Sequence, residues 1–182
     1  MTVHRIRFVT RVLGVALFAV AAVQAPANAA QPDPVPEEGL IVQESTGGLM
    51  TPDDQAADKD QYVQIWRRDP GNDYYGSQYW DFQRLRNGAY TIRNTAINRC
   101  LQTRHGNTAV GTRLWLTDCN RGREQQWYIV EDHDNRYAII PARNSNAVVG
   151  TRGTGRDEYV VLAERWSSAD RLWTFKNTTG RP

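Results

Sequence analysis

Neighbouring carboxylates are the side chains of this sequence best suited to acid–base chemistry. Adjacent pairs include Asp53-Asp54, Glu131-Asp132 and Asp157-Glu158. Two carboxylates that flank a glycosidic bond can act as general acid and as nucleophile or general base in glycoside hydrolysis. Adjacent carboxylates on turns, however, are usually solvated surface groups. We therefore do not expect any of these pairs to be catalytic.

Sequence patterns of other enzyme classes are missing from the chain. It contains no Gly-x-Ser-x-Gly nucleophile turn, no His-Glu-x-x-His zinc motif and no glycine-rich phosphate loop. Metal ligands are also scarce, because His105 and His133 are the only histidines after residue 30 and two isolated cysteines do not complete a tetrahedral zinc site. The sequence therefore predicts a non-catalytic protein without a cofactor or a bound metal.

The first 29 residues have the three-part layout of a secretory signal peptide. Arg5, Arg7 and Arg11 form a basic start, residues 12–25 are almost wholly apolar, and Ala27-Asn28-Ala29 is a cleavage signal. The apolar stretch has about 14 residues, whereas a membrane-spanning helix needs about 20. An uncleaved anchor is the alternative. We expect residues 1–29 to be removed and the protein to be secreted, with no membrane span after cleavage.

A proline-rich leader, residues 30–38, follows the signal peptide. Its alternating prolines favour an extended segment, which is either a solvated spacer or an arm that docks on a partner. Removal of the signal peptide leaves 19 of the 22 basic residues against 20 acidic ones, a net charge of −1. Because nucleic-acid binding depends on basic charge, we expect no nucleic-acid partner.

A threefold repeat organises residues 39–182. Three tripeptides that end in tryptophan recur at intervals of 47 and 46 residues. They are Gln78-Tyr79-Trp80, Gln125-Gln126-Trp127 and Arg171-Leu172-Trp173. A period of 40–50 residues indicates one supersecondary unit that is used several times. We expect the three tryptophans to lie in the core as the hydrophobic marker of each unit.

Short β-strands are the predicted elements of each unit. Runs of β-branched and aromatic residues alternate with clusters of Gly, Asn and Asp, and no useful helical period occurs after the leader. The runs cover residues 90–92, 127–130, 137–140, 159–162 and 173–175. We therefore expect an all-β chain that folds as a single β-trefoil of three pseudo-repeats, with about twelve short strands.

With these repeats the chain resembles the ricin B-type lectin family, a β-trefoil family marked by Q-x-W repeats. The central repeat shows the resemblance best. It contains Cys100-Leu101-Gln102, Gly111-Thr112, Cys119-Asn120 and Gln125-Gln126-Trp127 in that order. The resemblance covers about residues 39–179 and implies carbohydrate binding, although function depends on sites placed on the fold. More distantly, the chain is similar to the A and C subunits of cytolethal distending toxins.

Cys100 and Cys119 are the only cysteines of the chain. Export favours their oxidation. In the family, a pair at these positions bridges two strands within one repeat, so the resemblance implies one intra-repeat disulfide. Closing a loop of this size stabilises the fold by about 3 kcal/mol.

Sugar sites of the family draw five positions from one repeat. These are an acid two residues after the first Cys position, a Gln and a stacking aromatic from a V-Q-L-W stretch, and an Asn and a Gln before the final Trp. The second repeat places Gln102, Trp115, Thr117, Glu124 and Gln125 there. The third repeat places Gly150, either Ala163 or Arg165, and Asp170-Arg171 at four of them. We expect both repeats to have lost the family-type site.

The first repeat keeps the most of this pattern. Val63-Gln64-Ile65-Trp66 nearly reproduces V-Q-L-W, and Gln78 is retained behind Ser77. Thr51 takes the acid position, with carboxylates close by in sequence, and a longer loop at residues 69–76 adds two tyrosines. The resemblance thus implies a ligand site made of Gln64, Trp66, Gln78, Asp53, Tyr74 and Tyr75. The alternative is that Trp66 and Gln78 only pack and hold strands together.

The function expected from these features is a secreted, non-catalytic module that binds a glycan or a cell-surface glycoconjugate. Two alternatives remain open. One is a receptor-binding or partner-binding subunit of a secreted toxin, for which Trp66 and the tyrosines at 74, 75 and 79 would form an aromatic patch. The other is a trefoil that inhibits an enzyme.

Overall fold

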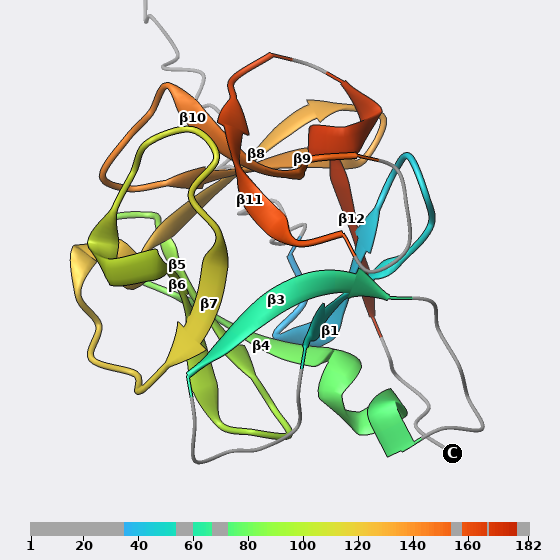
Figure 1. Cartoon of the computed structure of the whole chain (residues 1–182), viewed down its shortest axis with the longest axis vertical. Helices are drawn as coiled ribbons and strands as arrows, with labels where there is room; N and C mark the ends of the chain where they lie inside the picture. Colours follow the sequence, from blue (N-terminus) through green and yellow to red (C-terminus); the bar gives the residue numbers. More distant parts are fainter. Residues whose placement is uncertain (1–34, 54–59, 67–72, 154–157, 167, 178–182) are drawn as a thin grey trace, which may run out of the picture. The chain divides into compact units, whose positions relative to one another are not determined.

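Short β-strands are the main secondary-structure elements of the described chain (Figure 1). The computed structural model describes residues 35–53, 60–66, 73–153, 158–166 and 168–177. The strands are β1 (Glu38–Gln43), β2 (Leu49–Pro52), β3 (Gln61–Trp66), β4 (Tyr79–Arg84), β5 (Tyr90–Asn94), β6 (Arg99–Thr103), β7 (Leu114–Thr117), β8 (Trp127–His133), β9 (Arg136–Pro141), β10 (Ala147–Thr151), β11 (Val160–Glu164) and β12 (Trp173–Asn177). Four 3-10 helices join them: η1 (Asp73–Gln78), η2 (Arg104–Gly106), η3 (Arg123–Gln125) and η4 (Ala169–Arg171).

Six of the strands close into a barrel. β1 pairs with β4, β4 with β5, β5 with β8, β8 with β9, β9 with β12, and β12 returns to β1, every pair being antiparallel. Each repeat supplies two of these strands, its first and its last. Closure leaves none of the six strands with an unpaired edge, so the barrel needs no further sheet to satisfy its backbone.

The other six strands form three hairpins, β2–β3, β6–β7 and β10–β11. The hairpins also pair with one another. β3 pairs with β7, Gln64 bridges to Tyr159, and Arg113 bridges to Val161. Figure 1 shows β3, β7 and β11 around one centre. A closed barrel with three mutually paired hairpins is a β-trefoil, which confirms the predicted fold class and the predicted strand at each of the five runs.

The three Q-x-W tryptophans form the heart of the core. Trp80, Trp127 and Trp173 are each 0% exposed. A buried indole N–H needs an acceptor, and each of these donates to a backbone carbonyl of the second strand of its own repeat. The acceptors are Met50, Leu101 and Val149, in that order, at N–O distances of 3.0, 3.1 and 3.0 Å. The repeated bond explains why tryptophan recurs at this period and confirms its predicted place in the core.

The predicted disulfide is present between Cys100 and Cys119, with a Cα–Cα distance of 5.0 Å. It ties β6 to the segment that follows β7. It therefore lies within the second repeat, as the resemblance implied.

The end of the proline-rich leader packs against the barrel. Val35 is 5% exposed and belongs to the main hydrophobic core, and the Phe82 N–H donates to the Glu37 carbonyl at 2.8 Å. β1 begins at Glu38. The predicted signal peptide, residues 1–29, lies outside the described residues. No helix within the described ranges is long and apolar enough to cross a membrane.

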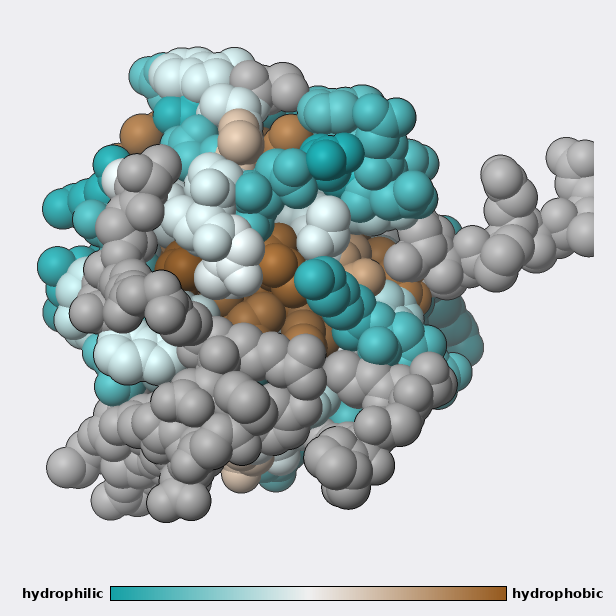
Figure 2. Space-filling model, turned by 90° about the vertical axis from the view of Figure 1, so that its right-hand side faces the viewer, coloured by the Kyte–Doolittle hydropathy of each residue, from teal (hydrophilic) through white to brown (hydrophobic). Residues whose placement is uncertain are grey.

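The surface is mostly hydrophilic, with hydrophobic residues gathered in one area of the face that Figure 2 presents. Large hydrophobic side chains that are strongly exposed are few in the described chain. They are Val110, Tyr128, Val130 and Trp166. Trp166 is 52% exposed, in contrast to the three core tryptophans, and belongs to the third repeat.

Candidate functional site

A common register relates the three hairpins and identifies equivalent positions in the repeats. In each repeat, one backbone carbonyl of the second strand accepts the hydrogen bond of the core tryptophan. The residue that follows this carbonyl pairs with a residue of the third strand. These pairs are Thr51–Gln64, Gln102–Trp115 and Gly150–Val161. A second set of equivalent pairs lies two residues earlier in each second strand. These pairs are Leu49–Trp66, Cys100–Thr117 and Val148–Ala163. Ala163, not Arg165, therefore stands at the aromatic position of the third repeat.

The outer face of β3 carries the predicted first-repeat residues. Burial alternates along the strand, with the side chains at 61, 63 and 65 buried and those at 62, 64 and 66 partly exposed. Because alternate side chains of a strand share a face, Tyr62, Gln64 and Trp66 form one row that faces outward. Gln64 and Trp66 thus lie on the same face of β3.

Two other predicted residues lie beside this row. Thr51, opposite Gln64, is 0% exposed, and its hydroxyl donates to the Leu49 carbonyl at 3.0 Å. Asp53 is partly exposed and its N–H donates to the Tyr62 carbonyl at 2.9 Å. Since Asp53 follows Thr51 by two residues, it continues the same side of the hairpin. It thus offers a carboxylate near a position where the family has an acid and this chain has Thr51.

The third group of predicted residues comes from η1. Gln78 is 1% exposed at the end of this 3-10 helix. Its equivalent in the second repeat, Gln125, is also buried at 0%. Tyr74 and Tyr75 belong to η1, but their side chains lie outside the described part of the structure. Gln78 is therefore buried in η1, which contacts β2, and does not share the outer face that Gln64 and Trp66 present.

The equivalent surface of the second repeat is occupied by the protein itself. Trp115 stacks edge-on against His105, with ring centroids 4.6 Å apart. The Gln125 amide donates to the Gln102 side chain at 3.1 Å and to the Asp118 carbonyl at 2.8 Å, and its oxygen accepts from the Asn120 N–H at 2.9 Å. Gln125 therefore holds the disulfide segment in place rather than facing a ligand.

The third repeat has been rebuilt with a cation and an aromatic ring. Arg171 stands at the position of Gln78 and Gln125, and its guanidinium lies 3.8 Å from the centroid of Trp166. Both residues line a hollow of about 300 Å³. Sequence comparison missed this pair because Trp166 comes three residues after the expected aromatic position. The only signal was a tryptophan outside the Q-x-W pattern.

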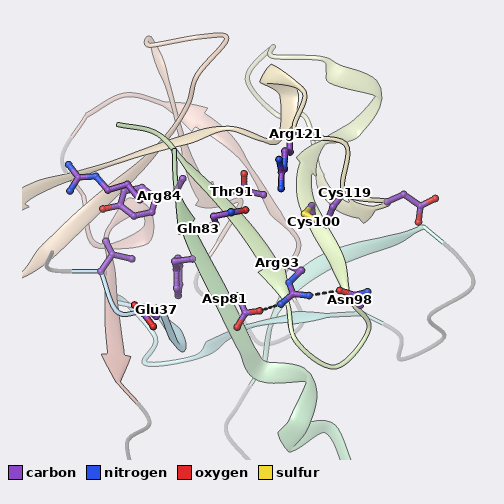
Figure 3. Close-up of a pocket in the computed structure, with 14 residues that line it drawn as sticks. Glu37, Asp81, Gln83, Arg84, Thr91, Arg93, Asn98, Cys100, Cys119 and Arg121 are labelled. Atoms are coloured by element: carbon purple, nitrogen blue, oxygen red, sulfur yellow. Dashed lines mark hydrogen bonds and ion pairs between the residues drawn. A yellow bond between two sulfur atoms is a disulfide. The ribbon is translucent and has the colours of Figure 1, made fainter. Parts of the chain in front are cut away.

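A larger polar hollow of about 1040 Å³ lies between β4, β5 and the disulfide (Figure 3). Its central cation, Arg93, forms an ion pair with Asp81 and donates to the Asn98 side chain at 2.6 Å. Figure 3 shows these groups turned toward one another, with Arg84 and Arg121 at opposite sides of the hollow. The charge of Arg93 is thus neutralised internally.

A comparison with known families agrees with this architecture. Residues 76–163 match the family model of the ricin-type beta-trefoil lectin domain-like proteins. This chain is a β-trefoil, and its residues 76–163 are similar to the ricin-type lectin domain. No curated protein matches its sequence. The part matched by the family model runs from the end of η1 to the third-repeat hairpin, so it includes the disulfide and two of the three hairpins.

Solved structures that are similar to this β-trefoil support the fold across all three repeats. The designed threefold-symmetric protein ThreeFoil has a TM-score of 0.70 and 17% identity, covering 78% of this chain and 99% of its own. A ricin B-like lectin from Macrolepiota procera, solved with lactose, has a TM-score of 0.63 and 20% identity, covering 78% and 95%. The cytolethal distending toxin of Haemophilus ducreyi has a TM-score of 0.63 and 14% identity, covering 76% and 82%. At these identities the likeness establishes the fold.

Proposed function

We propose that this trefoil is a secreted, non-catalytic carbohydrate-binding module whose sugar site is the outer face of β3. The observation that carries the proposal is the pairing of Gln64 with Trp66 on that face, both partly exposed. A sugar ring has an apolar C–H face, which stacks on an aromatic ring, and hydroxyl groups, which need fixed hydrogen-bond partners. Trp66 supplies the ring, and the Gln64 amide supplies both a donor and an acceptor.

The state of the other two repeats supports the same assignment. The second repeat fills the equivalent surface with Trp115 and His105. The third repeat has Val161 and Ala163 at the positions of Gln64 and Trp66. Neither presents a neutral sugar with a partly exposed ring beside an amide. Specificity within the first repeat would come from the carboxylate of Asp53, which accepts hydrogen bonds from hydroxyls as family acids do.

Binding to a glycan array tests the proposal most broadly. We expect the mature protein to bind a defined subset of glycans, and lactose is the first soluble probe because it accompanies the similar Macrolepiota procera lectin. Binding that persists in the Trp66→Ala variant would overturn the assignment of the site. A folded protein that binds no glycan but captures a protein partner would instead favour the toxin-subunit alternative.

Secretion and the absence of catalysis are separate parts of the proposal. Sequencing the N-terminus of exported protein should give a chain that begins near Ala30, whereas recovery of the uncut chain in membranes would contradict this. A panel of glycoside and ester substrates should give no turnover. Turnover that a single carboxylate substitution abolishes would overturn the non-catalytic assignment.

A further inference from the structure

A cluster of four basic side chains lines one hollow at the meeting point of the hairpins. Arg104, His105, Arg113 and Arg152 border a depression of about 580 Å³, and no carboxylate is among its described lining residues. Arg113 itself bridges to Val161 between two hairpins, at the centre where Figure 1 shows β7 and β11 approaching each other. We call these four residues the basic cluster.

The arginines of the basic cluster lack acidic partners within the described ranges. Arg104 and Arg113 make no ion pair there, and Arg152 donates only to the Gly111 carbonyl, at 3.4 Å. Other arginines of this chain do find carboxylates, as Arg99 does with Asp60 at 2.7 Å. Among the described residues, positive charge without a carboxylate partner is therefore concentrated here, although the chain as a whole is close to neutral.

Two tyrosines hold the guanidinium groups in place. Arg113 lies 4.1 Å from the ring centroid of Tyr159 and 5.1 Å from that of Tyr62, and Arg104 lies 5.5 Å from that of Tyr62. The two rings themselves meet edge-to-face, with centroids 5.5 Å apart. A cation fixed over aromatic faces loses less conformational freedom on binding a ligand, so the cluster is preorganised for an anion.

The basic cluster adjoins the proposed sugar site. Tyr62, which holds both arginines, shares the outer face of β3 with Gln64 and Trp66. Four residues of a strand span about 13 Å, which is the length of a short oligosaccharide. A glycan chain that stacks on Trp66 can therefore bring a charged group to Arg104 and Arg113.

We infer that the basic cluster binds the sulfate or carboxylate groups of an acidic polysaccharide. The choice of a polysaccharide as the ligand rests on the proposed carbohydrate-binding function, whereas the anion site rests on the arginines alone. A nucleic acid fits less well, because single strands are held by stacking of bases on open aromatic faces. Here the faces of Tyr62 and Tyr159 are covered by Arg104 and Arg113.

The test compares dextran sulfate with uncharged dextran of the same length, measured by isothermal titration calorimetry. The mature protein should bind dextran sulfate, with an affinity that falls as salt rises, and should bind dextran far more weakly. Arg104→Ala and Arg113→Ala should each weaken binding by about tenfold, the value of one charge-assisted hydrogen bond. Arg104 is exposed, so Arg104→Ala leaves the core untouched. This variant therefore still tests the site if Arg113→Ala unfolds.

Arg86 provides the matched control, because it is exposed and lies outside the basic cluster. Arg86→Ala removes the same net charge and should leave binding unchanged. If Arg86→Ala weakens dextran sulfate binding as much as Arg104→Ala and Arg113→Ala do, the binding depends only on overall charge. This result would overturn the site. Absence of dextran sulfate binding at low salt, or tighter binding of single-stranded DNA than of dextran sulfate, would also overturn it.

One further variant separates this inference from the proposed function. If Trp66→Ala loses array glycans while dextran sulfate still depends on Arg104, both assignments hold. If Trp66→Ala binds array glycans normally and Arg104→Ala loses dextran sulfate, the basic cluster stands and the first-repeat sugar site falls. If only the Trp66 variant loses its ligand, the basic cluster falls and the proposed function stands.

Discussion

Gln64 and Trp115 occupy the same position of the trefoil, one opposite Thr51 and the other opposite Gln102. The same backbone place thus presents an amide in the first repeat and an indole ring in the second. The indole stacks on His105 and fills the surface that the amide leaves open. This difference in side chains, rather than a difference in the strands, separates the repeat in which we propose a sugar site from the second repeat.

Trp66 should be the main contact for the ligand. We predict that Trp66→Ala weakens glycan binding by about 2 kcal/mol or more, because stacked aromatic residues dominate binding sites. The matched control is Thr117→Ala, the same position in the second repeat, which should leave binding unchanged. Calorimetry gives both affinities, and circular dichroism must show that both variants are folded. Loss of binding in Thr117→Ala but not in Trp66→Ala would move the site to the second repeat.

Gln64 and Gln125 should separate binding from stability. Gln125→Ala removes the partner of the Asn120 N–H and of the Gln102 side chain, and should lower the free energy of unfolding by about 1–3 kcal/mol. Gln64→Ala should weaken glycan binding with little loss of stability. Urea denaturation and calorimetry measure the two quantities. A Gln64 variant that is strongly destabilised would assign that amide a structural role instead.

The disulfide should contribute measurably to stability. Replacement of both Cys100 and Cys119 by alanine should lower the free energy of unfolding by about 2–4 kcal/mol, because the unfolded chain regains the freedom that the closed loop had lost. Urea denaturation of the oxidised protein and of the double variant gives the difference. Two free thiols in native protein would contradict the bridge.

Tyr137 should make stability depend on pH in the alkaline range. Burial raises the pKa of Tyr137, and the carboxylate of Glu131, its cross-strand partner, raises it further. The folded protein therefore keeps this proton at a pH where the unfolded chain has released it. Its contribution is complete below about pH 10 and falls as the pH rises above that value. In Tyr137→Phe the free energy of unfolding should decline less between about pH 9 and 11.

The sequence was sufficient to predict the fold because each repeat depends on one local requirement. A buried indole N–H must find an acceptor, and the carbonyls of Met50, Leu101 and Val149 provide it at the same point of each repeat. The Q-x-W spacing therefore carries the threefold symmetry. The position of the disulfide was implied by the resemblance to the ricin B-type lectin family, and the structure confirms it.

Contacts between distant segments were beyond the sequence pattern. Tyr62, Arg113 and Tyr159 meet only because three hairpins from three repeats converge. Likewise, Val35 lies in a proline-rich segment that favours extension, yet it joins the core. Patterns within one repeat report burial along a strand, but they do not report which repeats touch.

The indole N–H signals of the six tryptophans give the most direct test of where the ligand binds. Each repeat has one core tryptophan and one outer tryptophan, and the outer ones are Trp66, Trp115 and Trp166. In a two-dimensional ¹H–¹⁵N spectrum, assigned with one Trp→Phe variant per outer position, the protein is titrated with its strongest array glycan. We predict that the Trp66 signal shifts with saturation while those of Trp115 and Trp166 stay in place. A shift of Trp115 or Trp166 with an unchanged Trp66 signal would contradict the first-repeat site.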